Sequence, residues 1–196
     1  MRKVLLFCED TGHAQVIRGL FERLADEYEV EVSCEIRTAQ GGHGKMLHEL
    51  KQFVRGFARK PESLPDLLLI ARDANCQGYG DCKLHITKAL GDFACPWVAA
   101  IPDPHVERWL LLDASAFKSV LGKGCSAPDQ KCERERYKNL LIKAISDAGV
   151  KPFLGGIEYA TDIVNAMDLA RLERIDASLG HLLKDLRNRF NEWKQS

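Results

Sequence analysis

The first hundred residues alternate between strand-like and helix-like patterns, and this alternation constrains the fold more than any other feature of the sequence. Short apolar or alternating runs typical of strands occur at residues 4–8, 30–36, 67–71 and 97–101. Amphipathic helical stripes lie between them, at residues 16–24, 46–54 and 82–90. This order predicts an α/β fold of the Rossmann-like kind, with a mainly parallel four-stranded sheet flanked by helices.

The second half of the chain has helical patterns only. A stretch rich in Gly, Ser, Pro and Asp interrupts them at residues 122–130, and further stripes occur at residues 137–148, 160–167 and 179–193. We therefore expect an α/β core over residues 1–113 and a C-terminal helical extension over residues 114–196, packed together as one unit. The last stripe is expected to serve core packing or a contact between copies of the chain in a homo-oligomer.

The composition excludes several classes of protein. Lys plus Arg and Asp plus Glu number 28 each, so neither a strongly basic nucleic-acid coat protein nor an acidic tail fits. No apolar run is long enough to span a bilayer, and acidic residues follow the first strand too early for a signal peptide. Seven cysteines without a C-x-x-C pair argue against a secreted disulfide framework. These features predict a cytoplasmic protein with reduced thiols and no membrane contact.

Oxygen-bearing side chains follow three of the four predicted strands. Because the carboxyl ends of parallel strands meet at one edge of a sheet, we expect these side chains to lie close together. Any one of them also suits a turn or a helix N-cap, but three strand ends together favour a site for a hard cation, Mg²⁺ or Mn²⁺. The candidates are Glu9, Asp10, Asp73, Asn75, Asp103 and Glu107.

Glu9 after the first strand, with Asp73-x-Asn75 after a later one, resembles the Toprim domain of topoisomerases, primases and OLD-family nucleases. More narrowly, residues 7–10 and the segment from Asp103 to Asp113, which contains Glu-x-Trp-Leu-Leu from Glu107, look like small stand-alone Toprim-like proteins of bacteria. The resemblance covers most of the chain in element order, and its motifs lie in residues 7–10, 73–75 and 103–113.

The resemblance implies a role for each of these residues. Glu9 would be the general acid/base, Asp73 and Asn75 would be metal ligands, and Asp103 and Glu107 would complete the site or bind a second cation. Asn75 stands where the family has a second Asp, which lowers the charge of the site, and Asp10 or Asp81 would have to compensate.

The resemblance also implies an activity and a partner. Such proteins are encoded beside an ATPase of the OLD or ABC type, and the activity would be metal-dependent hydrolysis of phosphodiester bonds in defence against phage. The alternative is a non-catalytic regulatory or sensor subunit that keeps the scaffold, as the amide at Asn75 suggests. A nucleotide-hydrolysing enzyme ranks last, because residues 41–45 do not complete a P-loop: Met46 stands where Ser or Thr should be.

The zero net charge conceals a basic stretch between Arg37 and Lys60 that contains one acid, Glu49. Positive charge beside an acidic metal site suits a phosphodiester substrate, although a solvated helix face explains the same pattern. The candidates for contact with DNA or RNA are Lys45, Lys51, Arg55, Arg59 and Lys123.

Two further motifs are set aside. His105-x-Glu107 lacks the downstream P-C-x-x-C of zinc deaminases, which leaves His105 as a solvent-facing residue at a helix start. The cysteine spacings around Cys76 and Cys132 are wider than those of zinc knuckles, so these residues are expected to be ordinary thiols. Four basic residues that alternate with acids near position 135 are expected to be plain surface charge: Arg134, Arg136, Lys138 and Lys143.

Overall fold

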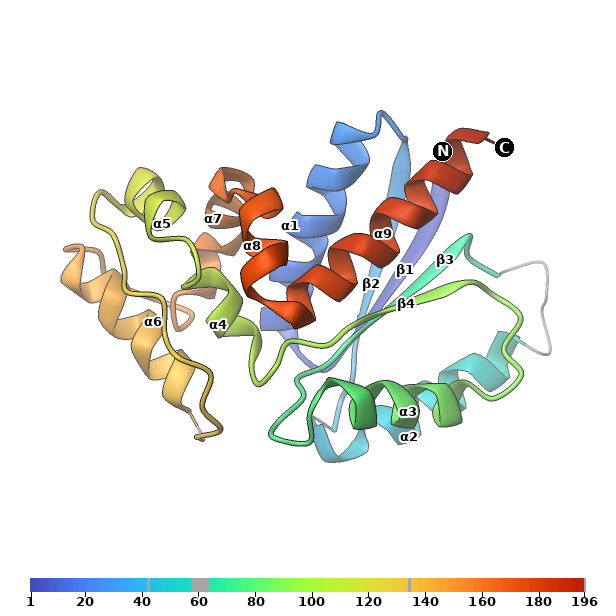
Figure 1. Ribbon diagram of the computed structural model, residues 1–196. Coiled ribbons are helices and arrows are strands. Elements are labelled where there is room, and N and C mark those ends of the chain that lie inside the picture. Colours follow the sequence, from blue (N-terminus) through green and yellow to red (C-terminus); the bar gives the residue numbers. More distant parts are fainter. Residues whose placement is uncertain (42, 58–63, 134, 196) are drawn as a thin grey trace.

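The computed structural model describes residues 1–41, 43–57, 64–133 and 135–195, and Figure 1 shows its strands side by side between helices. The strands are β1 (Arg2–Cys8), β2 (Val32–Thr38), β3 (Leu67–Ala71) and β4 (Trp97–Ala100). Each strand runs parallel to its neighbours, in the order β2-β1-β3-β4. The predicted α/β class with a parallel sheet is confirmed.

Helices follow each strand and then fill the rest of the chain. The crossover helices are α1 (Thr11–Glu27), α2 (His43–Phe57) and α3 (Tyr79–Leu90). The later helices are α4 (Val106–Leu110), α5 (Ala114–Leu121), α6 (Arg136–Asp147), the 3₁₀ turn η2 (Ile157–Tyr159), α7 (Ala160–Ala166), α8 (Leu169–Ile175) and α9 (Ala177–Gln195).

Apolar side chains on both faces of the central strands explain the continuous apolar runs in the sequence. Val4, Leu6 and Cys8 of β1 pack into the core beneath α1 and α9, whereas Leu5 and Phe7 pack beneath α2 and α3. Figure 1 shows α1 and α9 on one side of the sheet and α2 and α3 on the other. Strand β2 is the first strand in the sheet order, next to β1, and exposes much of its surface, which confirms its predicted place near an edge.

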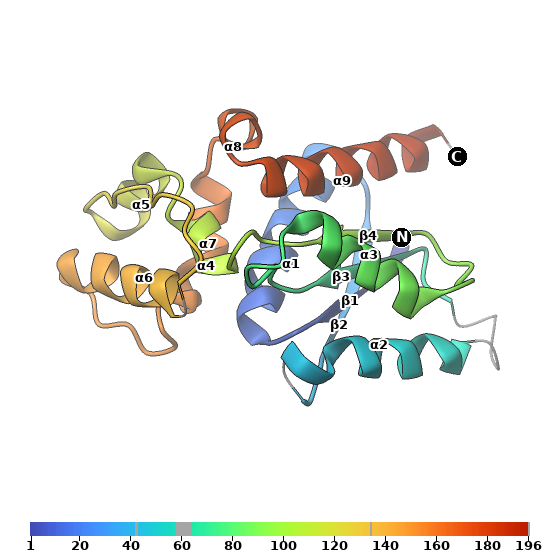
Figure 2. The same cartoon turned by 60° about the horizontal axis from the view of Figure 1, so that its bottom comes forward.

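The helical extension does not stay apart from the sheet. Helix α9 returns across the face of β4, and Leu179, Leu182 and Phe190 belong to the same buried cluster as β1 and α1. Figure 2 shows α5, α6 and α7 grouped at one end of the molecule, beyond the carboxyl ends of the strands. This end group supplies one wall of the site described below.

Cys76 and Cys132 form a disulfide, with their Cα atoms 5.5 Å apart. The expectation of ordinary thiols is therefore wrong for this pair, although Cys8, Cys34, Cys82, Cys95 and Cys125 are free. The fold brings the exit of β3 against the segment before α6, and their separation of 56 residues in sequence gives no sign of it. Among the described residues, no helix is long and apolar enough to cross a membrane.

Candidate functional site

The topology opens a crevice between the ends of β1 and β3. From β1 the chain crosses to β2 on one side and then returns to β3 on the other, so the loops after β1 and β3 diverge. A cleft of about 200 Å³ lies at this switch point. It is lined by Asp10, Thr11, Gly12, His13, Asp73, Val106, Glu107, Lys138, Leu154, Gly155 and Ile157.

His13 bridges the two strand exits. Its Nδ1 lies 2.9 Å from Oδ1 of Asp10, and its Nε2 lies 2.8 Å from Oδ1 of Asp73. Because an ionised carboxylate only accepts hydrogen bonds, both ring nitrogens donate, and His13 is an imidazolium. Burial alone would lower the pKa of His13, but the negative charge of Asp73 and the hydrogen bonds to both carboxylates raise it well above its usual range.

Asp73 is the centre of the cluster. Its Oδ1 also accepts a hydrogen bond of 2.8 Å from the Val106 amide, and its Oδ2 lies 2.9 Å from Nδ1 of His105. Burial opposes ionisation, but the charge of His13 and the hydrogen bonds of both imidazoles lower the pKa of Asp73. Two imidazoles and a helix-start amide thus hold this carboxylate in its charged form.

The two other acids of the cleft differ in how they are compensated. Asp10 caps α1 by accepting from the His13 amide at 3.0 Å, and, against the effect of burial, its bonds to His13 lower its pKa to about 2. Burial raises the pKa of Glu107, and the nearby charge of Asp73 raises it further. The positive charges of His13 and His105 act in the opposite direction but do not offset these two effects, so the pKa of Glu107 stays above its usual value.

The neighbours of Glu107 anchor the helix that carries it. Arg108 pairs with buried Asp176, and the indole Nε1 of Trp109 donates to Ser178 Oγ at 3.1 Å. Ser178 in turn donates to Asp176 Oδ1 at 2.6 Å. The Arg-Trp part of the segment thus fixes α4 to the start of α9, while Glu107 faces the cleft.

The structure brings together part of the predicted metal set. Asp10, Asp73 and Glu107 line the cleft, whereas Asn75 and Asp103 do not. The Asn75 amide bonds to the Pro104 carbonyl, and the Asp103 amide lies 3.3 Å from Ser178 Oγ, on the α9 side. In the part of the chain described, no group of three or more His, Cys, Asp or Glu side chains is already arranged around a metal position.

Glu9, the predicted acid/base, is buried at the same sheet edge. Its amide donates to the Ala71 carbonyl and so prolongs the pairing of β1 with β3. The side chain is not among those that line the cleft.

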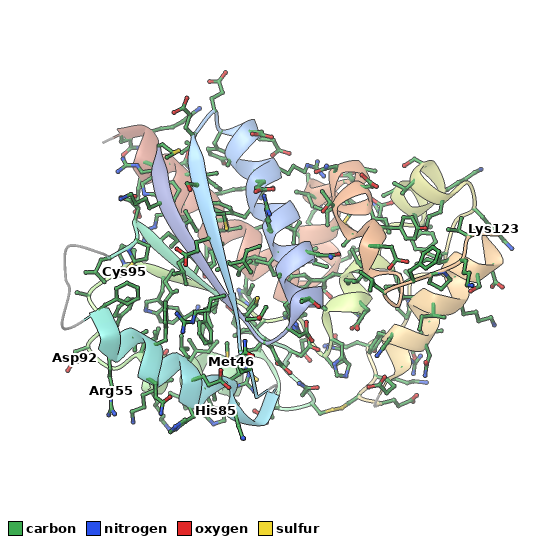
Figure 3. The ribbon with its side chains drawn as sticks, turned by 180° about the vertical axis from the view of Figure 1, so that it is seen from behind. Met46, Arg55, His85, Asp92, Cys95 and Lys123 are labelled. Atoms are coloured by element: carbon green, nitrogen blue, oxygen red, sulfur yellow. A yellow bond between two sulfur atoms is a disulfide. The ribbon has the colours of Figure 1, made fainter. Side chains whose placement is uncertain are left out.

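The predicted nucleic-acid contacts do not form one surface. Lys45, Lys51 and Arg55 are exposed on α2, and Lys123 donates to the Asp147 carbonyl at the far end of α6. Figure 3 shows Arg55 and Lys123 at opposite ends of the molecule. Arg59 lies outside the described residues.

Three residues of the cluster were missed by sequence reasoning. His13 lies three residues before Val16 and so belongs to the buried stripe of α1; a histidine on an apolar stripe just after a strand is the signal in the sequence. The expectation of a solvent-facing His105 is wrong, because its ring binds Asp73. Lys138, taken for plain surface charge, lines the cleft from α6, and no local pattern marks it.

Comparisons of the chain with family models, with curated proteins and with solved structures found no match. The Toprim resemblance therefore stays a prediction that rests on the residues themselves.

Proposed function

We propose that this chain is a metal-dependent hydrolase that cuts phosphodiester bonds in DNA or RNA. One observation carries the proposal: carboxylates that follow three different strands, Asp10, Asp73 and Glu107, line one small cleft. The meeting of parallel strand ends at one sheet edge brings these side chains near one another, and Asp10 also caps α1, but a cap function alone does not call for three acids in one cleft. A site that binds phosphate oxygens through a divalent cation needs several oxygen donors in one place, and these three acids supply them.

The donor set fits Mg²⁺ or Mn²⁺ in its chemistry. All three acids offer oxygen ligands, and the raised pKa of Glu107 marks negative charge that a cation would compensate. Asp10, Asp73 and Glu107 would hold the ion, which would stabilise the charge that develops on the phosphate oxygens during hydrolysis.

The chain's own residues supply orientation and proton transfer. His13 fixes the distance between the exits of β1 and β3 by donating to an acid on each side. His105 donates through Nδ1 to Asp73, which orients its ring, and within the described residues its Nε2 makes no hydrogen bond. His105 itself is not among the residues that line the cleft, so proton transfer through it would need a water between Nε2 and the substrate. Lys138 adds positive charge at the rim for the substrate phosphate.

The wider role follows from the resemblance. As in the small Toprim-like proteins that it resembles, the chain would act in the bacterial cytoplasm with an ATPase of the OLD or ABC type, in defence against phage. In those proteins the matching Glu is the general acid/base, and Glu9 would take that role here only if its side chain turned toward the cleft, which it does not line.

The test is cleavage of labelled single-stranded and duplex DNA and RNA with Mg²⁺ or Mn²⁺, by the chain alone and with an ATPase of the OLD or ABC type. We expect Glu107→Gln to lower the cleavage rate on the order of 10²-fold or more, since one charged group of the cleft becomes neutral. Asp26→Asn is the matched control, because Asp26 is exposed at the opposite end of α1. Equal cleavage rates of Glu107→Gln and wild type would show that the cleft is not the site of the reaction.

A non-catalytic regulatory subunit is the second candidate, and one observation favours it. Both oxygens of Asp73 already accept hydrogen bonds from His13, His105 and the Val106 amide, so a cation would have to displace them. Calorimetric titration with Mg²⁺ and Mn²⁺ separates the candidates. Binding that is lost in Glu107→Gln supports the hydrolase, and no binding at millimolar metal, with or without the partner, supports the regulatory subunit.

A further inference from the structure

The turn between α6 and η2 exposes two large apolar side chains beside the cleft. Phe153 is 78% exposed and Leu154 is 64% exposed, which makes them two of the three most exposed large hydrophobic side chains in the described residues, with Met1. Such residues cost solubility when they face water, so an adjacent pair calls for an explanation.

The turn holds this pair in place. The carboxylate of Glu158 accepts hydrogen bonds from the amides of Phe153 at 2.7 Å, Leu154 at 3.1 Å and Gly156 at 3.0 Å. Gly156 has φ 91°, and a Cβ there would lie 2.2 Å from Cδ1 of Ile145, so a glycine is required. The exposure of the pair is therefore fixed by the fold.

The pair adjoins both the cleft and positive charge. Leu154 and Gly155 line the cleft together with Asp73 and Glu107. Cε of Lys138 passes 3.7 Å from the position that a Cβ on Gly155 would take, and Nζ of Lys151 lies 5.9 Å from the ring centroid of Phe153. Leu154 and Lys138 thus line the carboxylate cleft, and Nζ of Lys138 also lies 3.6 Å from Oε2 of Glu135. Phe153, next to Leu154 in the sequence, has the ammonium group of Lys151 beside its exposed ring.

We propose that Phe153 and Leu154 form a platform on which unpaired bases stack, so that the substrate of the cleft is single-stranded nucleic acid. The identity of the substrate rests on the proposed function, whereas the binding itself does not. Aromatic side chains beside cations are the usual means of binding single strands, since every base has a π-face and every linkage a phosphate. In a duplex the base faces are covered by their neighbours, so this platform selects against paired strands.

The experiment measures binding without cleavage. Fluorescence anisotropy in EDTA at low salt follows a labelled 12-nucleotide single strand, as DNA and as RNA, and the duplex of the same sequence. We expect the single strand to bind more tightly than the duplex, and Phe153→Ala to weaken single-strand binding about tenfold. Leu84→Ala, which removes a 49% exposed side chain on α3, is the matched control and should bind as wild type does.

A tryptophan variant tests stacking directly. Phe153→Trp should keep the affinity of the wild type, and its added fluorescence should be quenched when the single strand binds, because the indole takes the place of the ring. No additional quenching relative to wild type would overturn the platform.

Three other outcomes overturn the proposal. They are equal binding by Phe153→Ala and wild type, equal affinity for duplex and single strand, and a wild-type dimer in sedimentation that Phe153→Ala dissolves, which would assign the pair to a second copy of the chain. The wild-type protein separates the two proposals: single-strand binding by a wild-type protein that cleaves none of the substrates with Mg²⁺ or Mn²⁺ keeps the platform and removes the hydrolase. Cleavage with unaltered binding in Phe153→Ala does the reverse.

Discussion

Two buried aspartates, Asp73 in the cleft and Asp113 at the N-cap of α5, where the core meets the helical extension, solve the same physical problem with different partners. Asp73 is 8% exposed and Asp113 is 2% exposed, and the pKa of each is lowered despite burial. A carboxylate in such a place needs hydrogen bonds and positive charge. Each has both, but the kinds of donor differ.

The partners of Asp113 are fixed in charge. It accepts from the amides of Ser115 and Ala116, both at 3.1 Å, and so caps α5. It also accepts from the Asp168 amide at 3.0 Å and pairs with Arg171 at 2.9 Å, which ties the start of α8 to that of α5. Amides and a guanidinium neither gain nor lose protons near neutral pH.

The partners of Asp73 are two imidazoles and one amide, and two further acids, Asp10 and Glu107, share its cleft. Imidazole is the side chain best suited to exchange protons near neutral pH. The difference teaches that burial and pKa shift alone do not mark a functional aspartate. The open cleft beside the aspartate, with two further acids in its lining, does.

The sharpest test of this comparison is the matched pair Asp73→Asn and Asp113→Asn. We expect Asp73→Asn to lower metal-dependent cleavage on the order of 10³-fold, because it removes the charge at the centre of the cleft. Asp113→Asn should leave the rate per folded molecule unchanged. Active-site titration against the folded fraction, measured by circular dichroism, gives that rate. A similar rate loss in both variants would mean that the two aspartates do not differ in role.

The next effect is on stability. Asp113→Ala removes the cap of α5 and leaves the Asp168 amide and Arg171 without this acceptor, so the free energy of unfolding should fall by about 3 kcal/mol. Urea unfolding followed by tryptophan fluorescence measures it. The exposed control Asp162→Ala, on α7, should change it by less than about 0.5 kcal/mol. A loss no larger than that of the control would show that Asp113 does not hold the extension together.

Local pattern was enough to predict the sheet and most helices. The continuous apolar run of Leu67–Ala71 requires burial on both faces, and alternation at residues 32–36 requires an edge, so both strands were readable from sequence. The return of α9 across β4 was not readable, because an amphipathic stripe shows that a face is buried but not against what. The same holds for the Cys76–Cys132 bridge.

The candidate site was predictable only where topology alone places residues. Asp10, Asp73 and Glu107 follow strands that end at one sheet edge, and they meet. Lys138 and Leu154 reach the cleft from the helical extension, whose docking depends on packing between distant segments. Asp103 follows β4 as Glu107 does, but its amide lies near Ser178, and only the path of the chain into α4 decides which acid faces the cleft.

A smaller effect concerns pH. Burial opposes ionisation of Asp113, but the amides of Asp168 and Ala116 and the charge of Arg171 lower its pKa in the folded protein. Its stabilising contribution is therefore complete above the unfolded pKa of about 3.9 and is lost as the pH falls through the folded value. The unfolding free energy of wild type should exceed that of Asp113→Asn by about 1–2 kcal/mol at pH 7 and converge with it below about pH 4. Urea titrations from pH 7 to pH 3 test this, and a constant difference would assign the effect to the hydrogen bonds alone.

The smallest expected effect discriminates between the site expected from sequence and the site in the structure. Asp103→Asn should leave cleavage within about twofold of wild type, because Asp103 does not line the cleft, whereas Glu107→Gln removes a lining charge. The two acids are four residues apart and follow the same strand, but only Glu107 lines the cleft. The cleavage rate of both variants, measured over a range of metal concentrations, tests this difference. An equal loss of activity in both variants would mean that the bound cation draws Asp103 into the site. The prediction that all acids after the strands ligate the cation would then describe the active protein better than the lining of the cleft does.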